Sequence, residues 1–90
     1  MHYIYIIYSH KIDKFYVGET QFVKQRLKQH NQETYKGAFT KSANDWIIVK
    51  TIPFKSRNEA LKAEKFIKKM KSRKFIHKLI DNHVFIYDII

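Results

Sequence analysis

The chain has 90 residues, with 18 lysines and arginines against 8 acids and no cysteine. This length favours one domain spanning residues 1–90, and the missing cysteines exclude a disulfide framework or a thiolate zinc site and fit a cytoplasmic location. The formal net charge of +10 favours nucleic acid as a partner over a merely lysine-rich surface, and no apolar run approaches the roughly 20 residues of a membrane span.

Two short β-prone segments open the chain and predict a hairpin. Residues 3–8 (YIYIIY) are apolar or aromatic at every position, which is typical of a central strand covered on both faces. Residues 15–18 (FYVG) follow a polar connection and predict a second strand. If the loop holds an even number of residues, Tyr5 and Tyr16 lie on the same face, because side chains alternate along a strand. One such pairing places Tyr16 opposite Ile7.

A helix is predicted from Thr20, a residue type that caps helix N-termini, to about Asn31. Arg26 and His30 lie one turn apart on the flank of its apolar stripe and face the same way. The stripe itself consists of Phe22, Val23 and Leu27.

The middle of the chain predicts a long loop and a third strand. Residues 32–43 are mostly polar, contain one glycine and show no clear period. Residues 46–54 (WIIVKTIPF) predict a strand that is ended by Pro53.

The last third of the chain predicts mainly helix. Ser56 and Glu59 form a capping box that begins a helix running to about Lys71. Residues 73–80 predict a short further helix, whereas the pattern of residues 81–90 is compatible with a strand or a packed extension. The expected fold class is therefore α/β, with a small three-stranded antiparallel sheet flanked by helices in the order β-β-α-β-α-α.

Glu64 is the residue that folding alone explains least. It lies inside the apolar arc of its predicted helix, and a carboxylate facing a core costs several kcal/mol unless it is paired, protonated or bound to a metal. A salt bridge to a neighbouring arginine, or a place at the edge of the arc, is the structural explanation. The other members of the arc are Ala60, Leu61, Ala63, Phe66, Ile67 and Met70.

Arg26, His30 and the tyrosines have structural explanations as well. Arg26 could pair with Glu64, or its guanidinium fork could bind a phosphate. His30 is either a hydrogen-bonded packing residue or a proton-transfer group. Six tyrosines in a small sheet-containing protein are explained by packing alone.

Taken in order along the chain, these residues resemble the motifs of the GIY-YIG endonuclease superfamily, in its short single-domain type. YIY at residues 3–5 stands in place of GIY, and YVG at residues 16–18 stands in place of YIG. Arg26, His30 and a helical glutamate after the third strand follow in the same order. The resemblance covers nearly the whole chain and implies a hydrolase that cleaves phosphodiester bonds.

The resemblance implies a role for each of these residues. Glu64 would bind one divalent metal ion, Mg²⁺ or Mn²⁺, and Arg26 would contact the scissile phosphate. Tyr16 would act as general base toward the attacking water, Tyr5 would hydrogen-bond that water or the phosphate, and His30 would have a hydrogen-bonding or proton-transfer role. A phenol with a pKa of about 10 is a poor base at neutral pH, so Tyr16 needs the metal and the Arg26 charge nearby.

Three further residues are weaker candidates for nucleic-acid binding: Gly18, Lys41 and Asn82. Gly18 is explained by turn chemistry, and the resemblance implies that it also permits close approach of backbone or substrate, so both interpretations can hold together. Some members of the family have a lysine after this glycine, whereas this chain has Glu19; Arg26, Lys41 or another group would then have to activate the tyrosine. Asn82 matches, at loose spacing, a late asparagine that members of the family often have.

The leading hypothesis is therefore a metal-dependent DNA endonuclease. It would recognise DNA shape or backbone, with branched, nicked or single-stranded DNA as candidate substrates and repair or recombination as the expected setting. The alternatives are a non-catalytic nucleic-acid-binding module of the same fold and a structural or partner-docking domain. The basic residues 68–74 are either a solvated helix end or contacts for the DNA backbone. The apolar residues 84–90 either complete the core or pair two chains as a homodimer.

Overall fold

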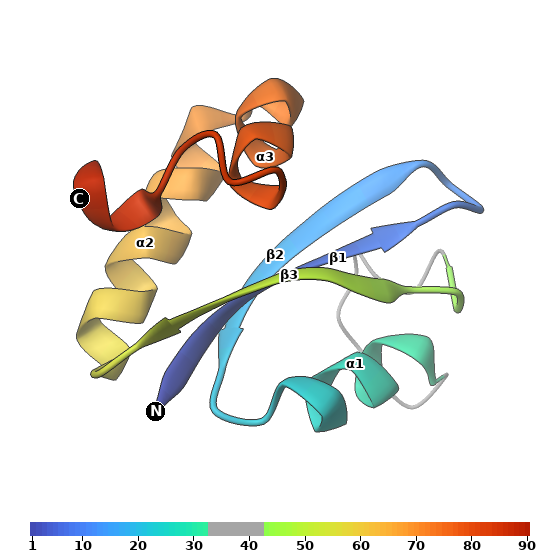
Figure 1. Ribbon diagram of the computed structural model, residues 1–90. Helices are drawn as coiled ribbons and strands as arrows, with labels where there is room; N and C mark the ends of the chain where they lie inside the picture. The colour runs from blue at the N-terminus through green and yellow to red at the C-terminus, as the bar shows by residue number, and fades with distance from the viewer. Residues whose placement is uncertain (33–42) are drawn as a thin grey trace.

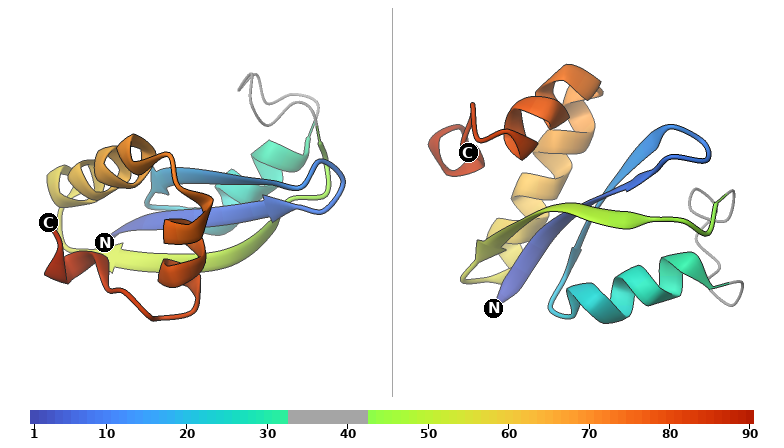
Figure 2. Two further views of the ribbon diagram at one scale, coloured as in Figure 1. Left: turned by 90° about the horizontal axis from the view of Figure 1, so that it is seen from above. Right: turned by 45° about the vertical axis from the view of Figure 1, so that its right-hand side comes forward.

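The structure, a computed structural model, describes residues 1–32 and 43–90. It confirms the predicted fold class: a three-stranded antiparallel sheet lies between helices, with α1 on one face and α2 and α3 on the other (Figures 1 and 2). The elements in chain order are β1 (His2–Ser9), β2 (Lys14–Thr20), α1 (Val23–Asn31), β3 (Ile47–Phe54), α2 (Arg57–Met70) and α3 (Arg73–Ile80).

The sheet has the order β2-β1-β3, so the apolar first strand is central, as its composition predicts. Its residues Ile4, Tyr5, Ile6 and Ile7 are fully buried. The hairpin pairs Ile7 with Tyr16, which confirms the expected register and places Tyr5 and Tyr16 on the same face. β2 is an edge strand, and this position decides which side chains can reach the site.

Each face of the sheet has its own hydrophobic cluster. On the side of α2 and α3, Ile4, Ile6 and Val17 pack with residues from both helices. On the side of α1, Tyr5 and Ile7 pack with buried Trp46 and with partly buried side chains of α1. Alternate residues of β1 therefore enter different clusters, and the tyrosine face is the face covered by α1.

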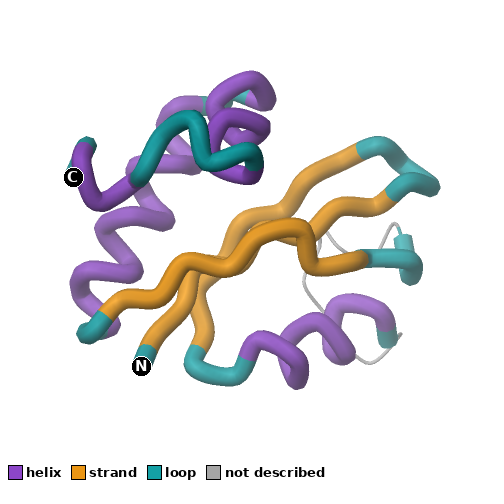
Figure 3. Tube along the Cα trace, viewed as in Figure 1, coloured by secondary structure: helices purple, strands orange, loops and turns teal. Residues whose placement is uncertain are grey.

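The N-cap of α1 is Phe22, two residues after the predicted N-cap Thr20. Thr20 remains in β2, and its hydroxyl accepts a hydrogen bond from the backbone N–H of Phe22 at 3.0 Å, so it shapes the turn before the helix. Phe22 is the N-cap residue and is 62% exposed. Its predicted place in the buried stripe is wrong, because it precedes the first helical turn. Figure 3 shows this short loop between β2 and α1.

α2 begins where its capping box predicts. The Ser56 hydroxyl accepts a hydrogen bond from the backbone N–H of Glu59 at 3.2 Å, and the helix ends at Met70 before a left-handed Lys71 (φ 47°). Its buried face is narrower than predicted, since Leu61 and Met70 are exposed. The buried members of the arc are Ala60, Ala63 and Ile67.

The last residues form a packed extension and not a strand. A short 3₁₀ helix, Ile86–Asp88, lies beside α2 and the end of β3, and Ile86 is fully buried in the larger cluster (Figure 3). The Tyr87 hydroxyl donates a hydrogen bond to the carbonyl oxygen of Pro53, a β3 residue. This segment therefore completes the core. Within the described residues, the helices are too short or too polar to cross a membrane.

Candidate active site

The pairing of β1 with β2 places Tyr5 directly opposite Gly18. A Cβ atom on Gly18 would lie 2.5 Å from the Tyr5 hydroxyl oxygen, so the phenol occupies the space that any other side chain would fill. Gly18 lies inside the strand and not at its end, and its φ is not positive. The glycine therefore does not serve a turn, and the group that approaches it closely in the structure is the Tyr5 ring; close approach of a substrate stays a prediction.

Tyr5, Tyr16 and His30 form a cluster contributed by β1, β2 and α1. The Tyr5 hydroxyl and His30 Nε2 share a buried hydrogen bond of 2.8 Å. The Tyr16 ring centroid lies 4.9 Å from the imidazole and 6.2 Å from the Tyr5 ring. The structure thus brings three predicted site residues into mutual contact. Tyr5 is fully buried and His30 is nearly so, whereas Tyr16 is half-buried at the edge strand.

His30 is a neutral imidazole at pH 7. Burial, and secondly the positive charge of Arg26, lower the pKa of His30 to about 4. A neutral ring can donate one hydrogen bond and accept another, whereas the charged ring only donates. The cluster therefore contains a ring that can hold an oxygen in place by a hydrogen bond without adding charge.

Arg26 lies one helical turn before His30, where its positive charge acts on the imidazole. Its side chain is half-buried. Among residues 1–32 and 43–90, no ion pair joins Arg26 to an acid, so the pair with Glu64 that was one structural explanation does not form. A partly desolvated guanidinium without a carboxylate partner in the described part of the chain is suited to bind an anion such as phosphate.

Glu64 lies on α2, across the sheet from α1, and a lysine links it to Tyr16. Lys68 Nζ donates a hydrogen bond to Glu64 Oε2 at 2.9 Å and lies 5.4 Å from the centroid of the Tyr16 ring. Because β2 is an edge strand, a long side chain from α2 can reach round it to the tyrosine. Glu64 is thus at the edge of the apolar arc, with its side chain 19% exposed, and its partner is a lysine one turn along the same helix and not the expected arginine.

The donor set at Glu64 fits a hard cation with one protein ligand. Within the described ranges, no group of three or more histidine, cysteine or acidic side chains could hold a metal ion. A single accessible carboxylate suits Mg²⁺, which keeps several waters and binds phosphate oxygens as well. The Lys68 ammonium competes for one carboxylate oxygen. Any cation would therefore use the other oxygen or displace the lysine.

The weaker sequence candidates do not join this cluster, apart from Gly18. The Asn82 side chain accepts a hydrogen bond from Lys50 of β3, the edge strand on the opposite side of the sheet from β2. Lys41 lies outside the described residues. Glu19, where some family members have lysine, is held by His2 at 2.9 Å and by Arg57 at 3.6 Å.

Lys68 is the functional candidate that sequence reasoning missed. Within residues 68–74 it is one of several lysines that look like a solvated helix end. The available signal was its position four residues after Glu64, the spacing at which a glutamate and a lysine meet on a helix. The contact with Tyr16 depends on tertiary structure and has no local signature.

Comparison with known proteins identifies a family for most of the chain. The family model for the GIY-YIG catalytic domain matches residues 1–77. The match includes all five principal candidates, which are Tyr5, Tyr16, Arg26, His30 and Glu64, and it ends before Asn82. Searches of the curated proteins and of the solved structures found no significant match.

Proposed function

The chain belongs to the GIY-YIG catalytic-domain family, a family of nucleases, and we propose that it is a metal-dependent endonuclease that hydrolyses phosphodiester bonds in DNA. The observation that carries the proposal is the convergence of Tyr5, Tyr16 and His30 from three separate elements. Packing alone does not require a tyrosine hydroxyl, a second tyrosine and a neutral imidazole at one place, beside an arginine that pairs with no acid among residues 1–32 and 43–90.

Tyr16 is the proposed general base. Of the two clustered tyrosines it is the one with exposed surface, at the edge of the sheet. Its phenolate oxygen takes a proton from the attacking water, and the nearby Lys68 ammonium favours the phenolate over the phenol. Lys68 thus performs the task expected of the family lysine that is replaced here by Glu19.

Tyr5 and His30 support this chemistry from the buried side of the cluster. Tyr5 is fully buried and shares its hydroxyl with His30, so we assign it a positioning role and not direct contact with the water. His30 is neutral at pH 7, and its role is either to hold the Tyr5 hydroxyl in place by a hydrogen bond or to transfer a proton. Arg26 binds the scissile phosphate and stabilises the negative charge that grows on it during attack.

Glu64 is the proposed ligand of the metal ion, Mg²⁺ or Mn²⁺. When bound, such an ion supplies positive charge that offsets the charge on the phosphate and the leaving oxygen. Glu64 provides one carboxylate oxygen for this purpose, with water and phosphate completing the coordination.

Cleavage assays with matched variants test the proposal. Wild type, Tyr16→Phe and Glu64→Ala are incubated with linear, nicked and branched DNA in Mg²⁺ or Mn²⁺, and in EDTA. We expect wild type to cut at least one substrate only with metal, and both variants to be at least about a hundredfold slower. No cleavage by wild type on any substrate would sink the proposal, and equal cleavage by all three proteins would indicate a contaminating nuclease.

One observation favours a second function. The Lys68–Glu64 ion pair occupies one oxygen of the carboxylate that a metal ion needs, as would suit a non-catalytic nucleic-acid-binding module that keeps the fold. This alternative predicts that wild type binds DNA with strong salt dependence and does not cut it in either metal. The same cleavage assay, run beside a binding titration, separates the two functions.

A further inference from the structure

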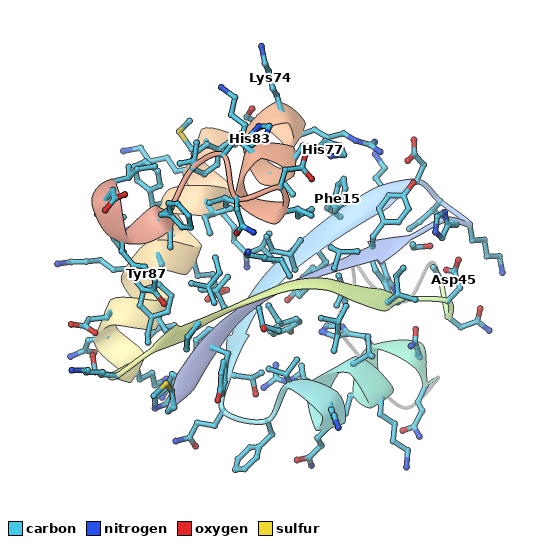
Figure 4. All side chains as sticks on the ribbon, viewed as in Figure 1. Phe15, Asp45, Lys74, His77, His83 and Tyr87 are labelled. Carbon is cyan, nitrogen blue, oxygen red and sulfur yellow. The ribbon has the colours of Figure 1, made fainter. Side chains whose placement is uncertain are left out.

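A groove lies along the edge of β2, on the side facing α2 and α3. Its volume is about 570 Å³, within the usual range for ligand sites. Tyr16 and Lys68 belong to its lining, so the groove continues directly from the candidate active site. Figure 4 shows another lining residue, Phe15, on β2 beneath α3 and close to His77.

The lining combines an apolar floor with a basic rim. Phe15, Val17, Ile67 and Ile76 provide the apolar surface, and four cations, Lys14, Lys68, Lys71 and Arg73, surround it. The one acid in the lining is Asp13.

Two of the four cations are already paired. Arg73 Nη2 donates to Asp13 at 2.5 Å and Lys68 donates to Glu64 at 2.9 Å. Within the described residues, no ion pair includes Lys14 or Lys71, and both side chains are exposed. These two lysines are therefore the rim charges available to a ligand.

An unpaired nucleotide strand matches this combination better than a duplex does. Proteins bind single strands with a positively charged groove that tracks the phosphates and with apolar or aromatic surface against the bases. In a duplex the bases stack on one another and are shielded from such a floor, so a duplex would meet only the basic rim. Charge complementarity and continuity with the site both point to a nucleic-acid strand as the occupant.

We propose that this groove binds an unpaired stretch of the DNA strand next to the cleavage site, with Lys14 and Lys71 contacting its phosphates. The proposal rests on the proposed function and names its substrate class as single-stranded DNA or DNA with an unpaired flap. Bases of the unpaired stretch pack on the floor around Phe15 and Ile76, and the strand then passes Tyr16.

Binding measured in EDTA tests the groove independently of cleavage. Dye-labelled single-stranded DNA and a blunt duplex of the same sequence are titrated with wild type, with Lys14→Gln/Lys71→Gln, and with the control Lys62→Gln/Lys65→Gln. The control removes the same charge from exposed positions of α2 outside the groove lining. Thermal unfolding of each variant checks that the fold is retained.

Wild type and the control are expected to prefer the single strand, and the groove variant to lose most of that preference. For the groove variant, the slope of log K against log salt on single strands should be smaller by about 1.4, at roughly 0.7 per lost phosphate contact. Equal losses in both double variants would overturn the groove proposal, because net charge alone would explain them. Tighter binding of the duplex by wild type would overturn it too.

The outcomes also separate this proposal from the proposed function. Groove-dependent binding without cleavage in Mg²⁺ or Mn²⁺ would support the groove proposal and contradict the proposed endonuclease activity. If blunt duplex is cut as fast as single-stranded DNA, and the groove variant binds DNA as well as wild type does, the endonuclease proposal stands and the groove proposal is contradicted. Wild type that binds neither DNA would overturn both.

Discussion

Lys68 connects the two sides of the candidate site. It pairs with Glu64 and lies over the ring of Tyr16, so one positive charge acts on both the proposed metal ligand and the proposed base. In the proposed mechanism this charge favours the phenolate of Tyr16, and beside the carboxylate it opposes a second cation. The two effects have opposite consequences for activity and can be measured separately.

Replacing Lys68 with glutamine should slow cleavage while strengthening metal binding. Without the ammonium the phenolate is less favoured, so the pH of half-maximal cleavage should rise by about one unit and the rate at pH 7 should fall roughly tenfold. The half-saturating Mg²⁺ concentration should decrease. Lys65→Gln, on the exposed face of α2, is the control, and a Lys68→Gln profile that keeps the wild-type pH midpoint would assign Lys68 a purely structural role.

Buried His30 makes stability depend on pH between about 4 and 6.5. Its pKa is about 4 in the folded chain and about 6.5 when unfolded, so the unfolded chain binds more protons in this window and stability falls as the pH drops. The loss between pH 7.5 and pH 4.5 should be roughly 2–3 kcal/mol. Hydrogen bonds from Arg73 and Ser9 lower the pKa values of Asp13 and Asp45, whose contributions therefore lie below this window.

Urea unfolding of wild type and His30→Gln at several pH values measures this contribution. The glutamine variant cannot bind the proton, so its stability should change by roughly 2–3 kcal/mol less over the same range. Parallel pH dependences of the two proteins would show that His30 is not the group responsible.

At the scale of elements, the pairing of β1 with β2 fixes the geometry of the site. Gly18 is the position at which this pairing least tolerates a larger side chain. Gly18→Ala places a Cβ 2.5–2.7 Å from three atoms of the Tyr5 phenol, so the ring or the strand must shift. Unfolding measurements should show a loss of about 1–3 kcal/mol. Cleavage should also fall, because the Tyr5–His30 hydrogen bond is displaced.

A double-mutant cycle with Tyr5→Leu isolates this contact. The leucine side chain is smaller than tyrosine and has no ring, so it leaves room for the added methyl group. Gly18→Ala should therefore cost less stability in that background. Strictly additive costs in the two backgrounds would mean that the glycine serves the backbone and not the tyrosine.

The elements with local signals were predictable from the sequence. The capping box of α2, the period-two register of the hairpin and the apolar central strand each depend on neighbouring residues, and the structure confirms them. The start of α1 was not predictable in this way, because Thr20 is the last residue of β2 and its hydroxyl serves the turn instead of the helix. A residue that suits two adjacent elements is assigned by the tertiary structure.

The sequence predicts which candidate residues share a face of an element, but not the geometry in which they meet. Side-chain periodicity places Tyr5 with Tyr16 and places Arg26 with His30. It cannot show that Tyr5 is fully buried against His30, or that Lys68 reaches round an edge strand to Tyr16. Those contacts join residues that are 25 and 52 positions apart in the chain, and the packing of helices on both faces of the sheet creates them.

At the scale of the whole molecule, the C-terminal segment divides into a buried anchor and an exposed apolar surface. Ile86 is 1% exposed in the larger cluster, whereas four neighbours are 42–54% exposed: Phe85, Tyr87, Ile89 and Ile90. The anchor belongs to the fold of one chain. The exposed residues are the surface on which the expectation of a homodimer depends, and that expectation stays a prediction.

Two variants distinguish these roles. Ile86→Ala should destabilise the chain by roughly 2–4 kcal/mol, because it leaves a cavity in a packed cluster. Ile89→Ser/Ile90→Ser should change stability by less than about 0.5 kcal/mol. If the exposed end pairs two chains, sedimentation should show a dimer for wild type and a monomer for the double serine variant. Equal sedimentation of these two proteins would show that this surface holds no second copy, and an Ile86→Ala protein as stable as wild type would show that the segment does not complete the core.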